Sequence, residues 1–152
     1  MEAEPCMRKS QSGVTLMELL TVMVVIGILT AIAVPSYRRY LIRAQRSDAS
    51  TALLRVQTSE EKFYLQKGTY STDLTSAPKD GGLGIGATSE RGFYDLKVDP
   101  TPTGYTATAK PNSTKGGQAD DKTCGTFSVS ETGIKKALDP DGTTDRTAEC
   151  WR

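Results

Sequence analysis

The sequence predicts an α+β protein in which a long N-terminal helix packs on a four-stranded antiparallel sheet. Three observations support this prediction. An apolar run extends from Val14 to Val34, a helix-forming stretch follows it to about Gln66, and short segments of alternating apolar and polar residues occupy 92–138. Such periodicities indicate helices and half-buried strands. One-sided alternation in strands is typical of an antiparallel sheet with one face in water.

The apolar run is long enough to cross a membrane. Its 21 residues would form about 32 Å of helix, and a bilayer core is about 30 Å thick. Glu18 is the only ionisable residue in the run. A charge at such a depth is costly and usually functional, although a carboxylate near a helix end can also reach the headgroups.

Residues 36–66 continue the helix without Pro or Gly. The residues at helical spacing are Tyr37, Leu41, Ala44, Asp48, Ala49, Ala52, Leu53, Val56, Glu60 and Phe63. We expect a helix of about fifty residues that bends near Pro35 and stops at Gly68. Its basic residues would form a solvated or subunit-facing stripe, with binding to nucleic acid or anionic lipid as the alternative: Arg38, Arg39, Arg43 and Arg46.

Residues 67–91 show few regular signals and predict a flexible connecting loop. Gly82 to Ala87 formally fits G-x-G-x-x-A, but no strand precedes it and no clear helix follows, which argues against a dinucleotide site. Strands are expected at 93–98, 104–109, 126–130 and 134–138, with Tyr94, Leu96 and Val98 on one face.

Composition excludes several classes of protein. The net charge is +1, which argues against a dedicated nucleic-acid binder, so we expect no direct nucleic-acid partner. The chain has no His, which removes the commonest general base and metal ligand. No nucleophile with a plausible base is visible either, so we expect no enzyme, no catalytic residues and no cofactor.

Two further groups of residues suggest local structure. Cys124 and Cys150 lie 26 positions apart, which fits a disulfide in an oxidising compartment, with two buried free thiols as the alternative. Asp139, Asp141 and Asp145 surround a Gly and are a weak calcium candidate. A solvated turn is the preferred interpretation of these carboxylates.

Two cleavage sites compete near the N-terminus. Cleavage after Ala33, in the small-x-small sequence Ala31-Ile32-Ala33, would release a periplasmic binding module without the helix. The apolar run is longer than the usual core of a signal peptide, which argues against that site. The other site is Gly13, which follows Arg8 and Lys9 in a short polar leader.

The stretch S-G-V-T-L-M-E-L-L at 12–20 resembles the prepilin motif of type IV pilins and related pseudopilins. The resemblance implies cleavage between Gly13 and Val14 and N-methylation of Val14, where the family usually has Phe. It divides the chain into a leader 1–13 (shorter if Met7 is the start rather than Met1), a transmembrane and assembly helix 14–35 and a head 36–152. Pro35 matches a helix-bending proline of the family.

Four tracts, more narrowly, are similar to minor pilins of the PilE type: residues 104–109, 116–119, 124–127 and 150–151. The resemblance implies the pilin fold with a disulfide-bounded region 124–150. It implies a pilus subunit, made as a single-pass precursor in the inner membrane with a periplasmic head and then assembled into an extracellular fimbrium. The implied partners are major and minor pilins, the prepilin peptidase and N-methyltransferase, the inner-membrane assembly platform and the outer-membrane secretin. Twitching motility, cell adhesion and DNA uptake are the implied processes.

The resemblance also suggests a role for Glu18. After cleavage its carboxylate would pair with the Val14 amine of a neighbouring subunit, which neutralises two charges in an apolar core and sets the axial register.

One signal disagrees with export. More basic residues follow the apolar run than precede it, and a simple positive-inside count would leave the head in the cytoplasm. We give the motif and the cysteine pair more weight. A type II secretion pseudopilin shares the motif and is the main alternative.

Overall fold

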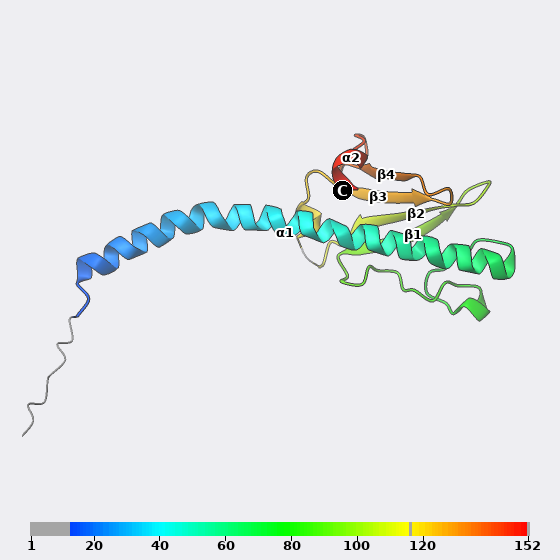
Figure 1. Ribbon diagram of the computed structural model, residues 1–152, viewed down its shortest axis with the longest axis horizontal. Coiled ribbons are helices and arrows are strands. Elements are labelled where there is room, and N and C mark those ends of the chain that lie inside the picture. Colours follow the sequence, from blue (N-terminus) through cyan, green and yellow to red (C-terminus); the bar gives the residue numbers. More distant parts are fainter. Residues whose placement is uncertain (1–12, 116, 152) are drawn as a thin grey trace, which may run out of the picture. The chain divides into compact units, whose positions relative to one another are not determined.

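The computed structural model (Figure 1) describes residues 13–115 and 117–151. The chain forms two units, Met1–Tyr37 and Arg38–Arg152. The predictions about the leader before Gly13, with Met7, Arg8 and Lys9, fall outside the described residues.

One helix, α1, spans Leu16–Lys67 and contains Pro35 in its interior. It stops where the sequence predicts, because Gly68 adopts the left-handed conformation at φ +71° that ends many helices. The N–H of Gly68 donates to the carbonyl of Tyr64 at 2.8 Å and so closes the last turn.

The sheet is a meander of four antiparallel strands in sequence order. Its members are β1 (Tyr94–Pro100), β2 (Tyr105–Pro111), β3 (Thr126–Ser130) and β4 (Lys135–Leu138). The α+β class, the long helix and the four strands are confirmed. Ile134, expected in the last strand, instead precedes β4 and is exposed.

The core of the head lies between the sheet and residues 49–63 of α1. The helix contributes Ala49, Leu53, Val56 and Phe63. The alternating inward residues of the sheet meet them, and the set includes Tyr94, Val98, Tyr105, Ala107, Ala109, Phe127, Val129 and Ala137. Figure 1 shows the strands running beside this part of α1. The dry face of the sheet is therefore the one that the sequence predicts.

The stripe of residues at helical spacing is buried only in the C-terminal half of α1. Asp48, Ala49 and Ala52 are buried, whereas Tyr37 and Ala44 at the start of the stripe are exposed. The sheet therefore covers the later part of the amphipathic face.

The loop after α1 is packed rather than open. Leu74 and Leu83 are buried, and the N–H groups of Leu83 and Ile85 donate to the carbonyls of Asp73 and Leu74, both at 2.8 Å. A short 3-10 helix, η1 (Pro78–Asp80), lies within this loop. A second one, η2 (Gln118–Asp120), lies between β2 and β3.

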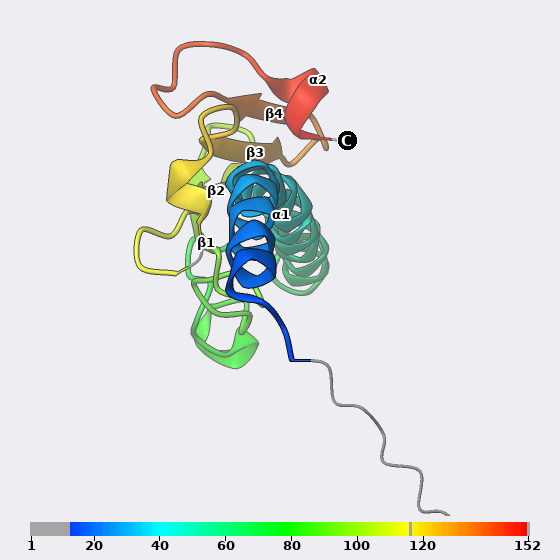
Figure 2. The ribbon, with the colours of Figure 1, turned by 90° about the vertical axis from the view of Figure 1, so that its left-hand side faces the viewer.

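Both outer strands have neighbours on their free sides. Beside β4, a short helix α2 (Thr147–Cys150) follows a bridge between Leu138 and Asp145, and the N–H of Arg146 donates to Ala137 at 2.8 Å. Beside β1, the N–H of Leu96 donates to Ala87 at 2.8 Å. Figure 2 shows α2 next to β4, with the loop after α1 (green) on the β1 side.

Candidate functional site

The first part of α1 presents an apolar surface on all sides. Every large apolar residue from Val14 to Val34 is between 47% and 82% exposed. The helix is long and apolar enough to cross a membrane, with a mean hydropathy of 2.4 in its most apolar window. A soluble helix would bury one such face against its own domain. The described residues do not bury this surface, so the segment needs an apolar environment from outside them.

The polar side chains of this segment are satisfied within the helix. The hydroxyl of Thr21 donates to the carbonyl of Met17 at 2.8 Å, and the hydroxyl of Thr30 donates to Ile26 at 2.7 Å. In an apolar medium every hydrogen-bonding group must be satisfied internally. Glu18 is therefore the one side chain of the run whose charge calls for a partner.

The start of α1 has a capping pattern that our sequence analysis missed. The hydroxyl of Thr15 accepts the backbone N–H of Glu18 at 3.2 Å, and the carbonyl of Thr15 accepts the N–H of Leu19 at 3.2 Å. The spacing Thr-x-x-Glu is the signature of a capping box. Glu18 also stands in the first turn, where a carboxylate stabilises the helix dipole. Local helix stability is thus a second role for Glu18, beside the predicted pairing.

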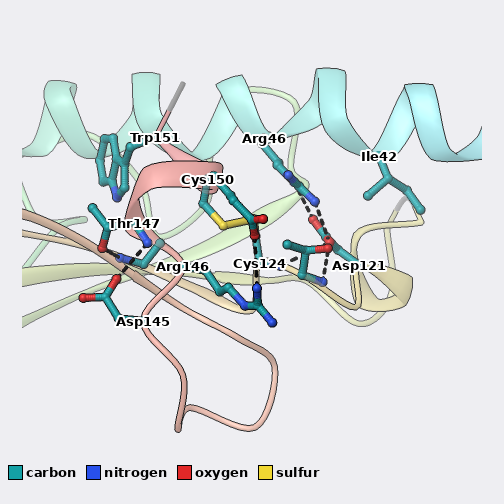
Figure 3. The surroundings of a disulfide bond; sticks show 12 residues. Ile42, Arg46, Asp121, Cys124, Asp145, Arg146, Thr147, Cys150 and Trp151 are labelled. Atoms are coloured by element: carbon teal, nitrogen blue, oxygen red, sulfur yellow. Dashed lines mark hydrogen bonds and ion pairs between the residues drawn. A yellow bond between two sulfur atoms is a disulfide. The ribbon is translucent and has the colours of Figure 1, made fainter.

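A disulfide joins Cys124 to Cys150, with a Cα–Cα distance of 6.0 Å. It attaches α2 to the loop that precedes β3 (Figure 3). Trp151 follows at once, and its indole N–H donates to the carbonyl of Lys136 at 2.9 Å. The Trp151 ring packs edge-to-face on Phe127, with centroids 5.8 Å apart. The C-terminal region is therefore held against β4 and the core.

Arg46 does not belong to a solvated stripe, so that part of the prediction is wrong. Its guanidinium makes two hydrogen bonds to Asp121, at 2.7 and 2.9 Å, across 75 positions of sequence. The Asp121 side chain is 2% exposed and also accepts the N–H groups of Thr123 and Cys124. Figure 3 shows this pair joining α1 to residues 118–124, the segment that ends at Cys124 and that we call the cysteine loop. Helical spacing alone could not reveal so distant a partner.

Gln118 adds a second link at the same place. It is fully buried, and its side-chain amide donates to the carbonyl of Ile42 at 2.9 Å. Together, Gln118, Asp121 and the disulfide fix the 118–124 loop between α1 and the C-terminal region.

Glu60 is a buried carboxylate inside the head. One of its oxygens accepts the N–H of Ser71 at 3.0 Å, while the other has no hydrogen-bond partner among the described residues. Burial raises the pKa of the Glu60 carboxyl, and the Ser71 bond partly opposes that rise. The Tyr105 hydroxyl is likewise buried without a partner in the described part of the chain.

The carboxylates proposed as a calcium candidate serve as turn acceptors. Asp139 accepts the N–H groups of Thr143 and Thr144, at 2.9 and 3.2 Å, and Asp145 accepts the N–H of Thr147 at 2.8 Å. These bonds hold the pKa of both carboxyls below the usual range. Within residues 13–115 and 117–151 there is no cluster of three or more His, Cys, Asp or Glu side chains placed to hold a metal.

Comparison with protein families gives two matches. Residues 35–128 match the family described as "Type IV minor pilin ComP, DNA uptake sequence receptor". Residues 8–34 match the prokaryotic N-terminal methylation motif. The resemblance to type IV pilins stated from the sequence is confirmed.

Individual relatives agree with these families. The chain is 39% identical over 71 residues to the type IV major pilin protein PilE of Neisseria gonorrhoeae, which covers 47% of this chain and 42% of the relative. It is 38% identical over 72 residues to the type IV major pilin protein PilA of Myxococcus xanthus, covering 45% and 33%. A fimbrial protein of Pseudomonas aeruginosa is 39% identical over 80 residues, covering 53% and 51%. The chain thus spans between a third and about half the length of these relatives.

Proposed function

The chain belongs to the ComP family of type IV pilins, which are structural subunits of pili, and we propose that it is a minor pilin that takes part in pilus assembly. We also propose the corresponding steps of processing and assembly. The precursor sits in the inner membrane with its head in the periplasm, is cleaved after Gly13, is methylated at Val14 and then enters an extracellular filament. The methylation motif and the long apolar helix support a membrane-anchored pilin.

The observation that carries this proposal is the exposed apolar surface from Val14 to Val34. The same surface suits two environments, lipid before assembly and the helices of neighbouring subunits after it. At about 25 cal/mol per Å² of apolar area, such burial supplies the main driving force in the filament. Other pilins are thus the principal partners. The peptidase, the assembly platform and the secretin follow from the family.

Glu18 gives the apolar packing a defined register. Apolar surfaces alone permit sliding, because burial has no direction. A carboxylate that pairs with the Val14 amine of a neighbour is stable at one axial offset, since any other leaves both charges unpaired. The capping bond at Thr15 holds the start of the helix in a fixed conformation for this pairing.

The test is mass spectrometry of the mature N-terminus in filaments sheared from the cell surface. We expect a methylated Val14 there. A protein that begins at Val34, or is recovered only as a soluble species, would contradict the proposal. In a second arm, Glu18→Ala should insert into the membrane but enter filaments poorly, whereas Thr21→Ala should behave like the wild type. A type II secretion pseudopilin would be absent from the surface filaments altogether.

We propose DNA binding as a second function, which the family description favours over our expectation from net charge. Three basic residues gather where β1 begins and β2 ends. Lys110 lies opposite Asp95, Lys115 packs beside Gly92, and the Arg91 guanidinium lies 5.8 Å from the Phe93 ring centroid. All three lie within the part of the chain that matches the family. Lysines and arginines so placed can contact successive phosphates.

Gel-shift titration of duplex DNA with the detergent-solubilised full-length chain tests this function. The double variant Lys110→Gln/Lys115→Gln leaves the salt bridge between Arg91 and Asp48, at 3.8 Å, in place and should weaken binding. The slope of log K against log salt should fall by about 2. Lys135→Gln/Lys136→Gln, outside the matched region, is the control. Equal losses in both double variants would argue for charge alone and against this site.

A further inference from the structure

A basic hollow of about 510 Å³ lies between α1 and the cysteine loop of the head. Its wall is formed mainly by Arg39, Ile42, Arg43, Arg46, Asp121 and Lys122. The loop side is fixed in place, because Gln118 and Asp121 bond directly to α1. The hollow is therefore a built feature of the head rather than a gap beside a loose segment.

The charges in the hollow leave a positive excess. Arg46 and Asp121 are neutralised by each other. Arg39, Arg43 and Lys122 form no salt bridge with any described residue, and Asp120 is the one further carboxylate on the wall. The Arg43 Nε–H donates to the Arg39 carbonyl at 3.4 Å, which leaves the other guanidinium N–H groups available. Guanidinium groups suit phosphate geometry, with two parallel hydrogen bonds from one group.

The place of this hollow in the sequence points to a membrane surface. Arg39 and Arg43 follow Val34, the end of the apolar run, by only five and nine residues of α1. At 1.5 Å per residue these are about 8 and 14 Å of helix. Tyr37 and Tyr40 are both exposed, and tyrosine is enriched at membrane interfaces.

We propose that this hollow binds the phosphate of an anionic phospholipid headgroup while the subunit is anchored in the membrane. Arg39, Arg43 and Lys122 hold the phosphate. The carboxylate of Asp120 accepts hydrogen bonds from headgroup hydroxyls. The side chain of Ile42 meets the apolar part of the lipid near the glycerol backbone. This inference rests on the proposed membrane-anchored state. It adds an anionic lipid as a partner, and it places Arg39, Arg43 and Lys122 at the level of the lipid phosphates.

Duplex DNA is the competing source of phosphate. The lipid is favoured because the hollow is concave, has an apolar wall at Ile42 and begins five residues after the membrane-spanning run. A DNA backbone would instead favour an exposed basic surface, such as the one around Lys110 and Lys115.

Native mass spectrometry of the detergent-solubilised full-length chain, titrated with single lipids, tests the proposal. We expect phosphatidylglycerol to bind more tightly than phosphatidylcholine, and free inorganic phosphate to compete only at much higher concentration. Each hydrogen-bonded contact to the phosphate contributes about 1 kcal/mol, or about fivefold in affinity. The double variant Arg39→Gln/Arg43→Gln should therefore bind phosphatidylglycerol about 25-fold more weakly, and Lys122→Gln about fivefold more weakly.

Arg38→Gln is the matched control, because Arg38 stands at nearly the same depth but does not line the hollow. Single lipids in detergent present no extended anionic surface for Arg38 to sense, so this variant should leave lipid affinity within about twofold of the wild type. Three results would each overturn the proposal. The first is an equal loss of lipid affinity for each substitution in Arg38→Gln and in Arg39→Gln/Arg43→Gln. The second is no preference between the two lipids. The third is a loss of DNA binding in Arg39→Gln/Arg43→Gln with lipid binding unchanged. Trp151 fluorescence verifies that each variant is folded. Filament incorporation is measured separately, so normal incorporation without lipid selectivity would refute this inference alone.

Discussion

In residues 14–37 the large apolar side chains are exposed around α1, whereas in the head many side chains of the same kinds are buried in a core between α1 and the sheet. The same helix thus passes from a part that needs an outside partner to a part that the chain covers by itself. One continuous helix is therefore stabilised in two different ways, by an outside partner in its first part and by the sheet of the same chain in its second. Changes in one unit should therefore leave the other largely unaffected.

Removal of the disulfide should have the largest effect, and only on the head. In the chain-entropy view, closing a loop of 26 residues contributes about 3.5 kcal/mol. Cys124→Ser/Cys150→Ser should lower the free energy of unfolding of the head by about that amount while the membrane anchor remains inserted. Denaturant titration of the full chain in detergent, followed by Trp151 fluorescence, measures it. A loss of membrane insertion in this variant would contradict the prediction that the two units are stabilised independently.

A matched pair of leucines compares the units directly. Leu53 is fully buried in the head, and Leu20 is 53% exposed on the apolar run. Leu53→Ala should cost about 3 kcal/mol of head stability, because it removes apolar contacts and leaves a cavity. Leu20→Ala should leave the unfolding curve of the head unchanged and lower only filament incorporation. If both changes shift the curve equally, the two units are one cooperative structure.

The ion pair between α1 and the cysteine loop should contribute less. Arg46→Gln removes two hydrogen bonds and leaves the buried Asp121 carboxylate with backbone donors only, so we expect a loss of about 2 kcal/mol in head stability. Arg55→Gln is the control, because Arg55 pairs with Glu90 where both side chains are well exposed. Such surface pairs contribute less than about 1 kcal/mol. Equal effects would mean that burial of the Arg46 pair is unimportant.

Substitution of Glu60 should have the smallest effect on the stability of the head, and this effect should depend on pH. Its pKa in the folded head lies above the ordinary value of 4.5, so the unfolded chain releases this proton at lower pH. Its contribution to the free energy of unfolding therefore falls as pH rises above about 4.5. Glu60→Gln keeps an acceptor for Ser71, and its stability relative to the wild type should rise from pH 4 to pH 7. Unfolding curves at several pH values measure this, with the exposed Glu61→Gln as the control. An unchanged difference between variant and wild type would contradict the assignment.

Local pattern predicted much of the fold. Alternation placed Tyr94, Val98, Tyr105 and Ala107 on the dry face, and Gly68 ended the helix where a left-handed residue was expected. These features depend on neighbours in sequence, which a periodic pattern records directly.

The features that prediction missed depend on distant residues. Arg46 and Asp121 are 75 positions apart, and Gln118 and Ile42 are 76 apart, so no local pattern links them. The loop after α1 is packed through hydrogen bonds between its own non-neighbouring residues, which periodicity does not record. The hydrogen bond from the Glu18 N–H to the Thr15 hydroxyl could have been predicted, since the spacing Thr-x-x-Glu is visible in the sequence.

The neighbours on both margins of the sheet have a consequence for how these molecules tolerate crowding. Anchored subunits meet in two dimensions, at local concentrations far above those of the same protein in solution. An open strand margin under such conditions is a template for runaway cross-β association. Here α2 and the disulfide shield β4, while the segment around Ala87 shields part of β1 and Pro100 ends it without an N–H to offer. In the proposed filament, assembly would then depend on the helices alone, because the covered strands offer no template for cross-β pairing between heads.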